Sequence, residues 1–132
     1  MRYLLTIYGD ESGWNDVTPE QSQQIMAAYG EFGQAAQAAG VLLGGEGLQP
    51  TSTATTVRVR DGEALTTDGP FAETREQLGG YYLLDCKDLD EAIGWAAKIP
   101  GVESGSVEVR PVMDYEATGR EEAHTQTEGV AR

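Results

Sequence analysis

The distribution of apolar positions predicts alternating strands and helices along the chain. In the first segment, RYLLTIYG, Tyr3, Leu5 and Ile7 point to one side of an extended chain and Leu4 and Tyr8 to the other. Both sides are therefore largely apolar, which is typical of a strand covered on both faces. Further strands are predicted at residues 41–48, 80–86 and 106–112.

Two helices are predicted between these strands. The first begins at Thr18, which can cap a helix, followed by Pro19 at the first helical position and Gln21 at capping-box spacing. Its apolar stripe repeats at steps of three and four residues and consists of Ile25, Tyr29, Phe32, Ala36 and Ala39. In the second helix, Asp88 and Glu91 have the same capping spacing. Its predicted apolar face consists of Leu89, Ala92, Ile93 and Ala96.

The segment TATTVRVRDGEALTTDG predicts a hairpin that turns at Asp61-Gly62. Without this hairpin, the order of elements is strand, helix, strand, strand, helix, strand. That order predicts an α+β protein with a ferredoxin-like antiparallel sheet and two helices on one face. We expect this domain to span residues 1–113. Residues 114–132 have almost no apolar content and are interpreted as an acidic polar tail, which holds the single histidine, His124.

Two helices can cover only one face of such a sheet, yet two of the predicted strands carry large apolar side chains on both faces. We therefore expect a homodimer that packs sheet against sheet in a dimeric α/β barrel-like assembly and buries about 1,500 Å² or more. Glu108 and Arg110 alternate with valines in the last strand and would point into this interface. There they would either line a cavity for a small molecule or form an ion-pair network without a ligand.

The composition of the chain excludes several classes of partner and cofactor. The formal net charge of −13 disfavours nucleic acids and anionic membrane surfaces, because both are bound through basic residues. No apolar run approaches the ~20 residues of a membrane-spanning helix, and no signal-peptide pattern is present. A single cysteine excludes an internal disulfide, so a cytoplasmic protein is expected. Cys86 is the single cysteine and is interpreted as a small filler near the core. With no histidine in the predicted domain, a zinc site is excluded, and neither a metal nor a cofactor is predicted.

The segment DGPFAETRE combines a turn with several charged residues. Asp68 can close the turn, and Phe71 is expected to fill the core beneath it. As structure alone, Glu73, Arg75 and Glu76 would form a local ion-pair cluster. As a pocket wall, the segment would supply Asp68 or Glu73 as the candidate catalytic base and an arginine as an anion contact. The candidate ligand-binding residues are Tyr8, Glu46, Arg75, Tyr82, Glu108 and Arg110.

The chain resembles the DGPF-type members of the YCII-related family through DGPFAETREQLGGYYLLD, DEAIGWAAKIPG and SVEVRPV, and also through YLLTIYG and AGVLLGGEGLQP. The resemblance implies a ferredoxin-like fold that dimerises through its sheet. It also implies a link to transcriptional regulation, since such relatives are often encoded beside sigma factors. Some YCII relatives carry a pocket histidine paired with an aspartate, but here the corresponding helix position holds Tyr29. Arg75 replaces the lysine of the family motif, which excludes an amine nucleophile at that position.

Three functional hypotheses follow from these patterns. We favour a dimeric protein that binds a small metabolite, with a regulatory protein as a further partner. The alternative is an acid–base enzyme that acts on a small metabolite in the same pocket. The third is an assembly scaffold without a ligand. Trp14, in the polar loop after the first strand, would either cover a pocket or anchor that loop on the surface.

Overall fold

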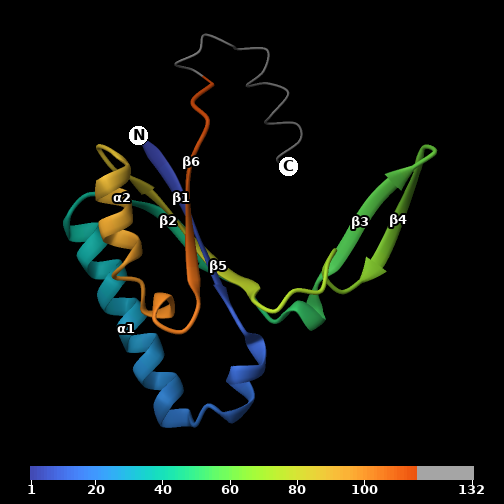
Figure 1. Cartoon of the computed structure of the whole chain (residues 1–132), viewed down its shortest axis with the longest axis horizontal. Helices are drawn as coiled ribbons and strands as arrows, with labels where there is room; N and C mark the ends of the chain where they lie inside the picture. The colour runs from blue at the N-terminus through green and yellow to red at the C-terminus, as the bar shows by residue number, and fades with distance from the viewer. Residues whose placement is uncertain (116–132) are drawn as a thin grey trace.

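The computed structural model describes residues 1–115 of the chain. Its main sheet consists of β1 (Arg2–Gly9), β2 (Leu42–Gly47), β5 (Gln77–Asp85) and β6 (Ser106–Pro111). Two α-helices lie on one side of this sheet (Figure 1), namely α1 (Pro19–Ala38) and α2 (Leu89–Ala96). The remaining elements are β3 (Thr55–Arg60), β4 (Glu63–Asp68) and the short 3-10 helices η1 (Glu11–Asp16), η2 (Thr51–Thr53) and η3 (Pro100–Val102).

The main sheet is antiparallel, with the strand order β2-β5-β1-β6. The predicted α+β class is confirmed, and the topology is compatible with a ferredoxin-like fold. Residues opposite each other in antiparallel strands share a face, so the register places Leu5, Tyr82 and Val109 together on the helix side. The other side, termed the open face, presents Leu4, Thr6, Tyr8, Glu46, Tyr81, Leu83, Glu108 and Arg110.

The hydrophobic core lies between the sheet and the two helices. Leu5 and Leu84 are completely buried there. Phe32 on α1 packs its ring against those of Tyr82 and Trp95, with centroids 4.8 and 5.9 Å apart. These aromatic contacts tie α1, α2 and the centre of the sheet into one unit.

The apolar stripe predicted for α1 is confirmed in its second half. Phe32 and Ala36 are buried, whereas Ile25 and Tyr29 are half-buried and line a pocket, Tyr29 being packed against the core as well. The expected place of Ala39 in the stripe is wrong, since this residue is the exposed C-cap of α1. Within residues 1–115, neither helix is both long and apolar enough to cross a membrane.

The short helix α2 buries only half of its predicted apolar face. Ala92 and Ala96 are buried, but Leu89 and Ile93 are 48% and 49% exposed. The buried side of the helix is centred on the two alanines and includes the half-buried Trp95. Because the indole of Trp95 occupies one flank of the contact with α1, the opposite flank, with Leu89 and Ile93, turns outward.

The hairpin β3–β4 forms a separate two-stranded sheet, termed the arm, that projects on the side away from the helices (Figure 1). Its turn is the predicted Asp61-Gly62, with positive φ angles of 52° and 79°. Val57 and Val59 in the arm are 60% and 61% exposed. The expected burial of Phe71 is wrong: its side chain is 78% exposed, because the DGPF turn lies at the base of the arm, where no core is present.

Cys86 is buried in the core, which confirms the interpretation of this residue as a small filler. Burial raises the pKa of its thiol, and the neighbouring carboxylate of Glu91 raises it further. A buried thiol with a raised pKa is a poor nucleophile, so Cys86 has a structural role.

The predicted capping box of α1 is present. The Thr18 side chain accepts a hydrogen bond from the backbone N–H of Gln21 at 3.1 Å, and the Gln21 side chain accepts one from the backbone N–H of Thr18 at 3.0 Å. We predict that Thr18→Ala lowers the free energy of unfolding by about 1 kcal/mol, because the backbone N–H of Gln21 loses its side-chain acceptor. Urea unfolding followed by circular dichroism measures the change. Thr55→Ala, at an exposed position of the arm, is the control, and an equal effect of the two substitutions would contradict the prediction.

Candidate functional site

Glycines on the helix side of the sheet leave unfilled space at one end of it. Gly47 pairs with Gly80, and Gly80 pairs with Ile7, so this row of three strands presents one large side chain to α1. In the next row, Gly45 lies so close to Tyr82 that an added Cβ would stand 2.6 Å from its ring. At Gly47, by contrast, an added Cβ would meet no atom within 4 Å, and this open space belongs to a cavity beneath the first half of α1.

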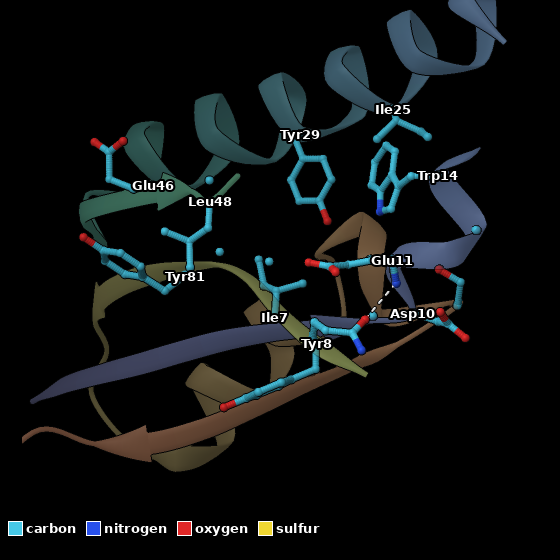
Figure 2. A pocket seen from close by; sticks show the side chains of 18 of the residues that line it. Ile7, Tyr8, Asp10, Glu11, Trp14, Ile25, Tyr29, Glu46, Leu48 and Tyr81 are labelled. Carbon is cyan, nitrogen blue, oxygen red and sulfur yellow. Dashed lines mark hydrogen bonds between the residues drawn. The ribbon is translucent and has the colours of Figure 1, made fainter. Parts of the chain in front are cut away.

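This cavity, termed the pocket, has a volume of about 760 Å³, within the range of about 300–1,000 Å³ typical of small-molecule sites. Ile25, Met26 and Tyr29 line it from α1, and Ile7 lines it from β1. Figure 2 shows Tyr29 pointing from α1 toward the sheet and Ile7 pointing from β1 toward α1. Trp14, from η1, lies near Ile25 at one end of the pocket (Figure 2).

Hydrogen bonds hold η1 at this end of the pocket. The Glu11 carboxylate accepts from the backbone N–H and the hydroxyl of Thr51, at 2.8 and 2.7 Å. The backbone N–H of Glu11 donates to Oε1 of Gln77 at 2.9 Å, which is the dashed line in Figure 2. Glu11 therefore links η1 to η2 and β5. These links position Trp14, which is 56% exposed, as a lining residue of the pocket.

The charged groups that line the pocket are all acidic. Asp10, Glu11 and Glu46 are lining residues, and within the described part of the chain no lysine, arginine or histidine lines it. Hydrogen bonds from the hydroxyl and the backbone N–H of Ser12, at 2.6 and 2.9 Å, lower the pKa of the exposed Asp10 carboxyl. The positive charge of Arg75 lowers it further. Asp10 is therefore ionised at neutral pH.

Two tyrosines give the pocket neutral hydrogen-bonding groups. Burial raises the pKa of the Tyr29 hydroxyl, while a hydrogen bond with the backbone of Gly101 acts in the opposite direction. Burial also raises the pKa of Tyr82, and the neighbouring Tyr29 adds to this shift. Both hydroxyls thus remain protonated at neutral pH. An added Cβ at Gly101 would stand 2.7 Å from the Tyr29 hydroxyl oxygen, so the glycine at this position leaves room for the hydroxyl.

The structure brings together three of the predicted ligand-binding residues. Tyr8, Glu46 and Tyr82 line the pocket. Tyr8 and Tyr82 lie on opposite faces of the sheet, however, so their rings do not form one wall. Arg75 is exposed and does not line the pocket, although its charge acts on Asp10 at the pocket's edge.

The other predicted residues lie elsewhere. Asp68, the last residue of β4, and Glu73 are exposed, and neither lines the pocket. Glu108 and Arg110 form an ion pair at 3.0 Å on the open face, with both side chains exposed. The charged residues predicted for one site are thus distributed over the arm, the DGPF segment and the open face.

The ion-pair cluster expected within the DGPF segment does not form among the described residues. The ion pairs between described residues are Glu108–Arg110 and that of the Met1 amino group with Asp85, and neither includes a residue of the DGPF segment. The Glu76 carboxylate instead accepts a hydrogen bond from the Ser106 hydroxyl at 3.0 Å. The segment thus contacts β6 through Glu76, and Arg75 acts on Asp10, so these side chains do not face one another.

Sequence reasoning missed the principal walls of the pocket. Ile25 was expected to pack in the core but lines the pocket, Tyr29 packs against the core and lines the pocket as well, and η1 was expected to be a loop. The signal that could have located the pocket is the set of glycines in β2 and β5. Within residues 1–115, no group of His, Cys, Asp and Glu side chains is arranged to hold a metal ion.

These observations define an α+β domain, compatible with a ferredoxin-like fold, with a pocket under its first helix. The family model of the YCII-related domain matches residues 1–116, and the chain belongs to this family. It is similar to an uncharacterised protein of Rhizobium meliloti (strain 1021), with 39% identity over 117 residues that cover 87% of this chain and 94% of that protein.

Proposed function

We propose that this protein binds a small, largely apolar molecule in the pocket beneath α1. The observation that carries the proposal is a cavity of about 760 Å³ at the point where Gly47 and Gly80 leave the helix side of the sheet bare. Protein interiors are normally close-packed, so a space of this size between helix and sheet indicates an occupant. Apolar walls with a few polar groups, here supplied by Ile7, Ile25 and Tyr29, are typical of metabolite sites.

The alternative, an acid–base enzyme, has less support from the geometry. A general base must reach the substrate and have a pKa near the working pH. Asp10 has a lowered pKa, and both carboxylate oxygens of Glu11 already accept hydrogen bonds from Thr51. The candidate bases Asp68 and Glu73 lie outside the pocket. A pocket without a side chain that has both the reach and the pKa of a general base favours binding over catalysis.

A substitution that fills the pocket tests the proposal. A Cβ at Gly47 would have no atom within 4 Å, and the backbone there is not in the left-handed region, so Gly47→Leu can be accommodated without strain. We predict that molecules found in a thermal-shift screen of metabolites on the full chain stabilise the wild type by about 2.7 kcal/mol at 100 times Kd. Gly47→Leu should weaken their binding about ten-fold or more, a loss of about 1.4 kcal/mol.

Gly30→Leu is the matched control, because Gly30 is an exposed residue of α1 that does not line the pocket and a Cβ there also meets no atom within 4 Å. It should leave binding unchanged. Ligands that bind Gly47→Leu as tightly as the wild type, or a screen without a single stabilising molecule, would contradict the proposal.

We further propose that the protein is a homodimer joined through its open face. Leu4, Tyr81 and Leu83 are half-buried on this face, and both α-helices lie on the opposite side of the sheet. A second copy would cover these side chains and give the barrel-like assembly expected from the sequence. The Glu108–Arg110 pair would then lie at the interface, where its charges already compensate each other.

The arm supports this assembly through its position. An isolated two-stranded hairpin is at best marginally stable in water. The arm projects on the same side of the sheet as the open face (Figure 1), so a second copy seated there would lie beside it. Its exposed Val57 and Val59 would then have a partner. In such a dimer, regulation of transcription through a protein partner would respond to occupation of the pocket.

A further inference from the structure

The rings and charges around the pocket narrow the class of its ligand, an inference that rests on the proposed binding function. A carboxylate or phosphate ligand needs a positive partner, usually an arginine or a lysine. Within residues 1–115 no basic side chain lines the pocket, and the arginines predicted as anion contacts lie outside it. Arg75 is exposed beside Asp10, and Arg110 is paired with Glu108 on the open face.

The aromatic side chains that line the pocket favour a positively charged ligand. Trp14, Tyr29 and Tyr82 line the pocket from η1, α1 and β5. The faces of such rings carry negative partial charge and attract an ammonium group placed over them, most strongly in the case of tryptophan. Trp14 is the exposed member of this set and is available to a ligand that enters from solvent.

A fixed carboxylate adds a full negative charge to these rings. Figure 2 shows the Glu11 side chain extending from η1 toward the middle of the pocket, below Tyr29 in this view. The two hydrogen bonds from Thr51 hold this carboxylate in place before a ligand arrives. Each carboxylate oxygen has more than one acceptor site, so Glu11 can also interact with a cation. The net charge of the whole chain, −13, attracts cations to the same site over a longer range.

We propose that the pocket takes an organic cation, an apolar molecule that carries an ammonium group, with the charge held between Glu11 and the ring of Trp14. The apolar part of the molecule lies against Ile7 and Ile25 over the bare glycines of the sheet. This assignment replaces the anion contact that the DGPF segment suggested from the sequence.

Three isosteric probes test the inference: phenyltrimethylammonium, tert-butylbenzene and benzenesulfonate. They share a phenyl ring and a tetrahedral substituent and differ in charge. Titrations on the full chain, followed by Trp14 fluorescence in the Trp95→Phe background, should show the cation binding about ten-fold tighter than the neutral probe. Benzenesulfonate should bind more weakly than both. Glu11→Gln, which keeps a carbonyl acceptor for Thr51, should abolish most of the preference for the cation and leave tert-butylbenzene unaffected.

Glu20→Gln is the matched control for the loss of one charge, since Glu20 is exposed in the first turn of α1 and does not line the pocket. It should leave the preference unchanged. Equal binding of the cation and the neutral probe, both blocked by Gly47→Leu, would overturn the inference about charge while the proposed binding site stands. The same is true if Glu20→Gln and Glu11→Gln have equal effects. If none of the three probes binds although the metabolite screen finds a ligand that Gly47→Leu weakens, the inference is overturned while the proposed function stands.

Discussion

Leu5→Ala should lower the free energy of unfolding by about 2–5 kcal/mol, the range observed when a completely buried leucine is truncated and a cavity remains. Leu5 is 0% exposed and lies in β1, an inner strand of the sheet between β5 and β6. Its side chain faces the helices. Its neighbours on the helix side, Tyr82 and Val109, belong to different strands and cannot both move into the space. Urea unfolding at fixed protein concentration measures the loss.

Leu89→Ala supplies the control for the same chemical change. Leu89 begins α2 and is 48% exposed, so its truncation should cost less than about 1 kcal/mol. If the two substitutions destabilised the protein equally, the division between the buried face of the sheet and the exposed flank of α2 would be incorrect. The comparison also tests the finding that Leu89 lies outside the core.

If the chain forms the proposed dimer, Leu83→Asp should convert it into a folded monomer. Leu83 lies opposite Leu4 in the centre of the open face, and its side chain does not reach the core. In a two-fold dimer one substitution places two carboxylates in the interface, and each unpaired buried charge costs several kcal/mol. The dissociation constant should therefore rise by about 100-fold or more, since each 1.4 kcal/mol corresponds to ten-fold. Sedimentation velocity measures the dissociation constant, and circular dichroism verifies that the monomer is folded.

Ile93→Asp is the matched control on the opposite side of the molecule, where Ile93 is 49% exposed on α2. It should leave the dimer intact. A wild-type chain that is monomeric at micromolar concentration would contradict the proposed assembly outright. A Leu83→Asp variant that dimerises as tightly as the wild type would show that the two copies meet through another surface.

Most of the fold could be predicted because its signals are local. Alternation assigns the two faces of β1 correctly, and the capping box and the Asp61-Gly62 turn mark the start of α1 and the tip of the arm. These features depend on a few adjacent residues and on backbone preferences that neighbouring elements do not change. The order of helices and strands along the chain was also predicted, and the observed topology is compatible with the ferredoxin-like fold that this order suggested.

The position of the pocket could not be predicted, because it depends on register between distant strands. Gly47 joins the row of Gly80 and Ile7 only after the irregularity between Leu42 and Gly44 in β2 shifts the pairing. A cavity is moreover an absence of side chains, whereas sequence reasoning looks for side chains that carry chemistry. The conspicuous charges of the DGPF segment therefore drew the prediction toward Asp68, although β4 ends with this residue at the base of the arm.

The wrong prediction of burial for Phe71 has a similar explanation. Phe71 follows a turn and reads as a core residue, but the arm projects away from the helices and leaves it 78% exposed. Whether an aromatic residue next to a turn is buried depends on the direction of the whole hairpin, which no local pattern determines. His124 and the rest of the predicted acidic tail beyond residue 115 lie outside the described residues.

The most direct test of a ligand site beneath α1 is a pair of ¹H–¹⁵N spectra of the full chain, recorded with and without a molecule that raises its melting temperature. The indole N–H of Trp14 and the amides of Gly47 and Gly101 should shift on binding, while the indole N–H of Trp95, packed on Phe32, should not. Shifts confined to the open face or the arm, with these pocket signals unchanged, would contradict the proposed site.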